Sequence, residues 1–157
     1  MSKSSRVLAL DIGASSVKVA EFDCASSGAI TLMAFDYREY GQELTEETRG
    51  FAITSVLRDM LQTGQFAARK ALVSISGQYA LTRFVPLPPV AEEEARVRQI
   101  VEFEARQNVP FPMEEVIWDY QLISNPEADE LEVMFVVIKN EIVEDITAAV
   151  QEAELEP

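Results

Sequence analysis

The stretch LALDIGASSVKVAEF, residues 8–22, decides how the fold begins, because a turn of small residues separates two apolar runs. Residues 6–10 have the pattern of a buried strand, and residues 17–22 have that of its hairpin partner. Asp11 closes the first run and Lys18 opens the second, so an acid and a base flank the turn. The stretch therefore predicts a β-hairpin whose turn can bring backbone N–H groups toward an anion.

The turn also has the residue types of a phosphate loop. Backbone amides and serine hydroxyls can approach a phosphate, and a lysine can offset its charge. A carboxylate such as Asp11 can hold Mg²⁺ through water, because that ion keeps much of its hydration shell. The candidate nucleotide-binding residues are Asp11, Gly13, Ala14, Ser15, Ser16 and Lys18, with Asp11 also the candidate for the metal. The same residues make a good hairpin turn whatever they bind, so a plain turn remains the alternative.

Composition restricts the function. The 157 residues are 48% hydrophobic and 25% charged, as in a soluble globular protein of one or two small domains. A net charge of −14 repels nucleic acid and anionic lipid surfaces. Histidine is absent, which excludes Ser-His-Asp and Cys-His catalysis. A single cysteine, no leader-like start and no long apolar run together predict a cytoplasmic location without insertion into a membrane.

Hydrophobic periodicity divides the chain into two groups of elements, with a change of character near residues 77–81. In the first group Thr45 is the expected N-cap of a helix that stops at Gly64. The face of that helix turned to the core is predicted to hold Phe51, Ala52, Val56, Met60 and Leu61. The other predicted elements are strands 6–10, 17–22, 29–40 and 71–75, then strand 81–85, helix 91–107, strands 116–123 and 131–138, and helix 141–153.

Two sets of motifs resemble known families. The opening stretch resembles the first phosphate motif, Asp-x-Gly-[Ser/Thr], of the actin-like ATPase superfamily, although Ala14 stands where relatives often have Ser or Thr. The later segments ALVSISGQYALTRFVPLPPV, QIVEFEARQNVPFPMEEVIWDYQLI and VMFVVIKNEIVEDITAAVQEAELEP resemble the PilM family of type IV pilus assembly proteins. That family is related to FtsA and to the cytoplasmic part of GspL, and the resemblance extends over essentially the whole chain.

The resemblance implies an α/β (α+β) fold. It implies a partial actin-like, RNase H-like lobe interrupted by a strand-helix-strand-strand module of the SHS2 type. The expected boundaries are 1–79 for the first part of the lobe, 80–139 for the module and 140–157 for a helix that returns to the lobe. Within the module, strands 116–123 and 131–138 are expected to form a hairpin that pairs with strand 81–85, and helix 91–107 to cover one face.

The resemblance also implies a partner. In PilM-like proteins a groove between lobe and module holds a short peptide from the start of PilN, a single-span inner-membrane protein. The chain is therefore expected to be a cytoplasmic adaptor of a type IV pilus or related secretion platform, peripheral to the inner membrane through that partner. The candidate partner-binding residues are Phe84, Val85, Val109, Phe111 and Trp118; ordinary core packing is the alternative for each of them.

ATP with Mg²⁺ is the cofactor that the resemblance implies for a full-length form. No glycine lies beyond Gly77 to build the second phosphate loop and adenosine segment of the superfamily. Because phosphoryl transfer requires a closed site, we expect the chain neither to bind nucleotide tightly nor to catalyse turnover alone. We expect it to be the first part of a longer protein, with a natural short form as the alternative. Other readings are an ATPase or kinase in the full-length form, an FtsA-like filament scaffold, and a homo-oligomer.

Overall fold

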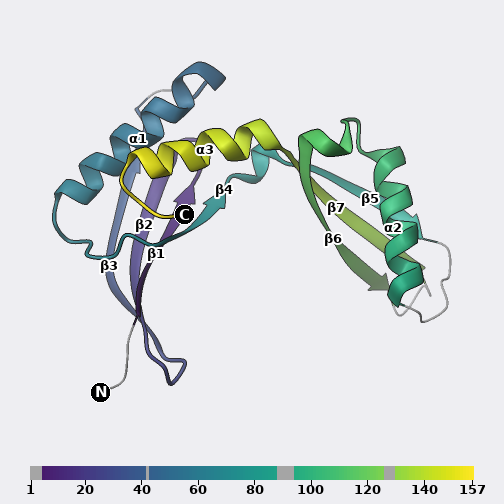
Figure 1. Ribbon diagram of the computed structural model, residues 1–157, viewed down its shortest axis with the longest axis horizontal. Helices are drawn as coiled ribbons and strands as arrows, with labels where there is room; N and C mark the ends of the chain where they lie inside the picture. The colour runs from purple at the N-terminus through teal and green to yellow at the C-terminus, as the bar shows by residue number, and fades with distance from the viewer. Residues whose placement is uncertain (1–4, 42, 88–93, 126–129) are drawn as a thin grey trace. The chain divides into compact units, whose positions relative to one another are not determined.

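The computed structural model describes residues 5–41, 43–87, 94–125 and 130–157 (Figure 1). The chain divides into two compact units, which are described separately below. The first unit comprises Met1–Ser76 with Glu144–Pro157, and the second comprises Gly77–Val143. Among the described residues, no helix has both the length and the apolar character needed to cross a bilayer.

The first unit is a four-stranded sheet with two helices on one of its faces (Figure 1). Its strand order is β3-β2-β1-β4, in which β1–β2 and β2–β3 are antiparallel and β4 is parallel to β1. The predicted hairpin is confirmed, and its register sets Asp11 opposite Lys18. The elements are β1 (Ser5–Ile12), β2 (Ser16–Cys24), β3 (Ile30–Glu39), α1 (Glu46–Gln62), β4 (Ala71–Ile75) and α3 (Asn140–Glu152), whose first residues belong to the second unit.

The core of the first unit lies between this sheet and its helices. Alternate strand residues face the helices because successive side chains of a strand point to opposite faces. The most buried apolar strand residues, at 2% exposure or less, are Leu8, Leu10, Ile12, Val17 and Val19. The helices contribute Ile53, Leu57, Met60, Ile146 and Val150, all at 1% or less.

The predicted inner face of α1 is wrong at one residue. Phe51 is 79% exposed, whereas Ile53, Leu57 and Met60 are fully buried. Residues turn by about 100° each around a helix, so Phe51 stands about 200° from Ile53, on the opposite side. The stripe that packs on the sheet follows Ile53, Leu57 and Met60 at spacings of four and three, and an aromatic side chain remains on the outer surface.

The predicted ends of α1 are confirmed. Thr45 is the N-cap: its side chain accepts a hydrogen bond from the Thr48 amide, and the Thr48 side chain accepts one from the Thr45 amide. This reciprocal arrangement satisfies two amides that the helix leaves without partners. Beyond the C-cap, Gly64 has φ +76°, a conformation that favours glycine.

The second unit is a three-stranded antiparallel sheet in the order β5-β7-β6. The expected pairing of residues 81–85 and 116–123 with residues 131–138 is therefore confirmed. Residues 91–93 of the predicted helix 91–107 lie outside the described residues. The elements are η1 (Gly77–Tyr79), β5 (Leu81–Leu87), α2 (Glu94–Asn108), η2 (Met113–Glu115), β6 (Val116–Asn125) and β7 (Glu130–Lys139).

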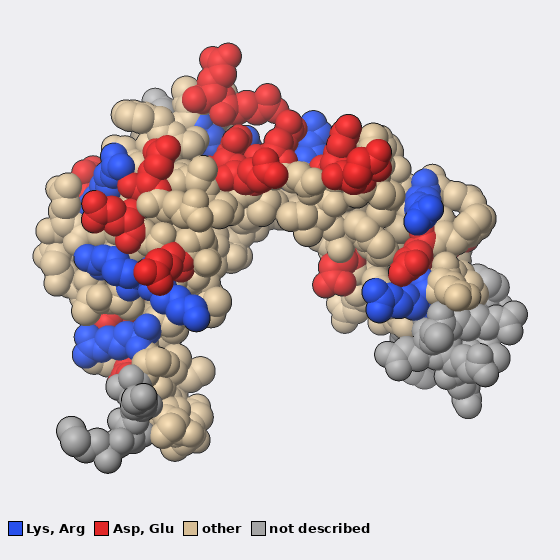
Figure 2. All heavy atoms as spheres, viewed as in Figure 1, with Lys and Arg blue, Asp and Glu red and all other residues tan. Residues whose placement is uncertain are grey.

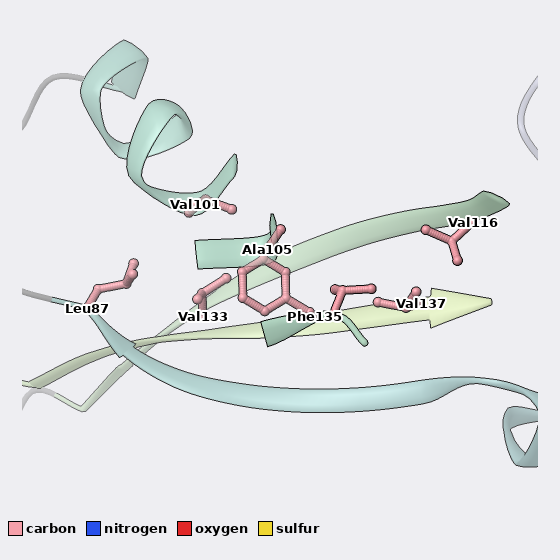
Figure 3. Close-up of a cluster of buried hydrophobic side chains, with 8 residues drawn as sticks. Leu87, Val101, Ala105, Val116, Val133, Phe135 and Val137 are labelled. Carbon is pink, nitrogen blue, oxygen red and sulfur yellow. The ribbon is translucent and has the colours of Figure 1, made fainter. Parts of the chain in front are cut away.

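The core of the second unit is apolar and lies between α2 and one face of the sheet (Figure 3). Val101 and Ala105 of α2 are fully buried, and Phe135 of the central strand is the largest fully buried side chain of the unit. The core residues are Leu87, Val101, Ala105, Val109, Val116, Val133, Phe135 and Val137. Two sheets, each packed against helices, confirm the predicted α/β fold class.

Candidate functional site

The β1–β2 turn is closed by backbone hydrogen bonds. The Gly13 amide donates to the Ser16 carbonyl at 2.9 Å. A Cβ added at Gly13 would lie 3.1 Å from that same oxygen, so the close approach favours glycine. The end of β3 braces the turn, because the Tyr40 amide donates to the Ser15 carbonyl at 3.0 Å and its hydroxyl to the Gly13 carbonyl at 3.4 Å.

Asp11 and Lys18 form an ion pair across the hairpin. The distance from Lys18 Nζ to Asp11 Oδ2 is 2.6 Å, and the two side chains are 46% and 47% exposed. The hydrogen bond to Asp11, followed by its charge, raises the pKa of Lys18 above its ordinary value. The two charged side chains predicted to bind phosphate and metal, Lys18 and Asp11, are therefore already paired with each other.

The structure adds two side chains that the sequence reasoning missed. Tyr37 lies directly opposite Lys18 in the β2–β3 register, and its hydroxyl donates to Glu39 Oε1 at 2.8 Å. That hydrogen bond is the main reason that the pKa of Tyr37 lies above its ordinary value. The signal was the alternation along strand 29–40, which puts residues 37 and 39 on one face of the predicted meander.

The six candidate nucleotide residues are brought together, and they fit a phosphate group in part. Ala14 and Ser15 are exposed, as a phosphate loop requires, whereas Ser16 is only 7% exposed. Lys18 would have to leave Asp11 before it could meet a phosphate. Among the described residues, no group of three or more cysteine, aspartate or glutamate side chains is arranged to hold a metal ion. An anion could therefore reach Ala14 and Ser15, but the charges of Asp11 and Lys18 are engaged with each other.

The five candidate partner-binding residues do not share one surface. Phe84 is 57% exposed and, by the alternation of β5, faces away from the core cluster. Val85, Phe111 and Trp118 are partly buried and pack against that cluster. Val109 is only 6% exposed and belongs to the cluster itself, so it offers a partner little surface.

Phe111 lines an apolar pocket within the second unit. The pocket has a volume of about 260 Å³. The distance from Lys139 Nζ to the centre of the Phe111 ring is 5.7 Å, within the range of a cation–π contact. The same ammonium group pairs with Glu141 Oε1 at 2.9 Å. The other lining residues are Gln78, Tyr79, Ala80, Leu81, Val137 and Ile142.

Of the residues that line this pocket, only Phe111 was predicted from the sequence as a partner-binding residue. Its walls come from η1, β5, β7 and the start of α3, which are far apart in the chain. Leu81 reaches Val137 because the β5–β7 register pairs them directly. The expected module topology implied that two of these strands are neighbours, but no local pattern marks the residues around Phe111 as a cavity.

Solved structures define the class of fold. A PilM–PilN type IV pilus biogenesis complex matches 96% of the chain with a TM-score of 0.72 at 23% identity. The cytoplasmic domain of EpsL, an inner-membrane component of the type II secretion system of Vibrio cholerae, matches 97% with a TM-score of 0.56 at 9% identity. The chain spans 45% and 55% of the lengths of those two chains. The chain therefore shares the fold of the corresponding parts of these two proteins.

The family follows from the sequence. The family model described as type IV pilus assembly protein PilM matches residues 9–157. The chain therefore belongs to the PilM family of type IV pilus assembly proteins. A comparison with curated proteins gives no match.

Proposed function

We propose that the chain belongs to a cytoplasmic assembly adaptor and holds the N-terminal peptide of a PilN-like inner-membrane protein. The apolar pocket beside Phe111 carries this proposal. A volume of about 260 Å³ suits one or two apolar side chains of a peptide rather than a whole ligand. Membership of the PilM family, and the PilN chain in one similar structure, support the choice of partner.

Three features of the pocket favour a peptide. Leu81, Val137 and Ile142 supply apolar walls, so a leucine or isoleucine of the peptide is desolvated there. Lys139 also lines the pocket, and its contact with the Phe111 ring and its ion pair with Glu141 hold this part of the wall in place. Leu81 also begins β5, which pairs only with β7 among the described strands, so an extended peptide can add to its other edge.

The test is a calorimetric titration with a synthetic peptide of about a dozen residues from the start of the PilN-like protein of the same organism. We expect a Kd of about 1 μM or tighter, close to −8 kcal/mol. Phe111→Ala should weaken binding about tenfold, because it removes an aromatic wall of the pocket. Phe103→Ala is the matched control, since Phe103 is 59% exposed on α2 and does not line the pocket.

Two results would contradict the proposal. One is the absence of heat with every peptide from such proteins while the chain remains folded by circular dichroism. The other is an equal loss of affinity in Phe111→Ala and Phe103→Ala, because the peptide would then not depend on this pocket.

The same proposal gives the β1–β2 turn a structural role in this chain. Lys18 is paired with Asp11, which favours weak nucleotide binding at this turn, and we infer no turnover from such a site. When bound, ATP with Mg²⁺ would supply a phosphate and a cation for Lys18 and Asp11 to contact separately. Titration with a fluorescent ATP analogue and Mg²⁺ should give no saturation, and tight binding abolished by Asp11→Asn would overturn this part.

A further inference from the structure

The first unit has a groove between α1 and α3 that neither candidate site uses. Its volume is about 340 Å³. Four of its lining residues are apolar or small and the other four are acidic. They are Glu46, Glu47, Gly50 and Phe51 of α1, and Asp145, Ala148, Ala149 and Glu152 of α3.

Polar cross-links fix the two helices that form the groove. Arg49 is central to them, because its side chain is only 6% exposed and its guanidinium pairs with Asp145. The three links are Arg49 Nη2 to Asp145 Oδ2 at 3.2 Å, Thr54 Oγ1 to the Ala149 carbonyl at 3.1 Å, and Arg58 Nη2 to the Glu152 carbonyl at 2.6 Å. A groove with fixed walls loses little freedom when it is filled, which favours binding.

The middle of the groove is open and apolar. A Cβ built on Gly50 meets no atom within 4 Å, so packing between the helices does not require glycine there. Glycine within a helix is unfavourable, and here it leaves space at the surface. Phe51, which stands beside it, is 79% exposed. An open hollow next to an exposed aromatic ring is typical of a surface that a partner covers.

The charge that lines the hollow is mostly negative. The described residues lining the groove include four carboxylates and no lysine or arginine, although one carboxylate, that of Asp145, also pairs with the buried Arg49 behind it. Figure 2 shows Asp and Glu gathered over the helical layer of this unit and Lys and Arg over its sheet. Asp145 and Glu152 are seven residues apart on α3, which separates them by about 10 Å along the helix. Charge complementarity therefore favours a basic partner, and the carboxylates repel an anionic one.

We propose that the α1–α3 groove binds a basic amphipathic helix of a partner protein. Two lysine or arginine side chains, seven residues apart on one face of that helix, meet Asp145 and Glu152. A small or branched apolar side chain between them fills the space over Gly50. Phe51 covers the bound helix from the side of α1, where it can also contact a cation. This surface lies in the first unit, so it is independent of the peptide pocket beside Phe111.

The test uses the ¹⁵N-labelled chain and a synthetic helical peptide of about 18 residues, long enough to form a helix. The peptide contains Leu, Ala and lysines spaced seven residues apart, and the control peptide has glutamate in place of every lysine. We expect the lysine peptide alone to shift the amide signals of Gly50, Phe51 and Ala148. Increasing salt should weaken its binding, because screening reduces the attraction between the charges.

Variants distinguish binding at the groove from a general attraction to the negative charge of the chain. Glu47→Lys should weaken the lysine peptide about tenfold, whereas Asp59→Lys, the same charge change on α1 outside the groove, should leave the affinity within about twofold. Gly50→Leu fills the hollow without changing any charge and should abolish the Gly50-centred shifts. Equal binding by Gly50→Leu and wild type, equal loss in the two lysine variants, or shifts away from the groove would overturn the proposal.

Discussion

The β1–β2 turn and the pocket beside Phe111 are candidate sites of opposite kinds. The turn is polar, local and self-neutralised, since Asp11 and Lys18 pair across one hairpin. The pocket is apolar and non-local, since its walls come from residues 78–81, Phe111, Val137 and the start of α3. The difference teaches that a motif of charged residues can be conspicuous in the sequence and yet satisfied by itself, while the surface with unmet apolar area has no motif.

The cores of the two units also differ in polarity. In the second unit, the described core residues between α2 and the sheet are all apolar. The first unit buries a carboxylate: Glu21 is 1% exposed and accepts hydrogen bonds from the amides of Ala67 and Ala68 at 2.5 and 3.0 Å. Arg6 pairs with the same carboxylate at 3.2 Å. Each site can therefore be disturbed through its own core.

The largest expected effect is in the core of the second unit. Phe135→Ala should lower the free energy of unfolding by about 3–5 kcal/mol, because it leaves a cavity at a fully buried position. Urea unfolding followed by tryptophan fluorescence checks this, since Trp118 is 6.1 Å from the Phe135 ring and its emission reports the second unit. Peptide binding should be lost with it. Phe84→Ala, at a 57% exposed position, is the control, and an equal loss there would contradict the assigned core.

The next effect is in the first unit. Glu21→Ala should cost about 3 kcal/mol, because it leaves the buried amide of Ala68 and the part-buried amide of Ala67 without an acceptor. The loss should appear in far-ultraviolet circular dichroism while Trp118 fluorescence still reports a folded second unit. Peptide binding near Phe111 should survive. Loss of peptide binding in this variant would show that the two units are not separable in the way that the comparison requires.

The pH dependence of the first unit follows from the same carboxylate. Burial alone would raise the pKa of Glu21, but the amides of Ala68 and Ala67 and the charge of Arg6 outweigh it, so the pKa lies below its ordinary value of 4.5. The stability it contributes is therefore complete above 4.5 and is lost as the pH falls through the lower pKa of the folded state. Unfolding curves of Glu21→Gln should lack this acid-side decline, and an unchanged decline would assign it to other groups.

The smallest effect is at the turn. Lys18→Ala should leave the midpoint of urea unfolding nearly unchanged, because exposed ion pairs contribute little to stability. Calorimetry should show unchanged binding of the peptide. A large fall in the urea midpoint would mean that the turn stabilises the fold far more than an exposed ion pair can.

Sequence patterns predicted what depends on neighbours along the chain. The hairpin around Gly13 and the capped start of α1 at Thr45 are local, and both are confirmed. Phe51 was wrongly predicted to face the core, because hydrophobic periodicity locates the buried face of a helix only to within a residue or two. Ile53, not Phe51, packs against the sheet. The resemblance supplied the pairing of β5 with β7, which local patterns could not.

The pocket and the α1–α3 groove were beyond reach for a different reason. Leu81 and Val137 meet through a register between strands far apart in the chain, and Arg49 meets Asp145 through the packing of two helices. The spacing of residues along the sequence predicts neither of these two contacts. Buried polar links such as Glu21 to the amides of residues 67 and 68 are equally invisible, because a glutamate in a strand more often marks the solvent face.

If the pocket beside Phe111 receives the N-terminal peptide of a PilN-like protein, the two should be in direct contact there. Intermolecular nuclear Overhauser effects between the isotope-labelled chain and the unlabelled peptide measure this. We expect contacts from leucine or isoleucine methyl groups of the peptide to the Phe111 ring and to the methyl groups of Leu81 and Ile142. A bound peptide whose contacts all lie elsewhere, for example on the exposed ring of Phe84, would contradict it.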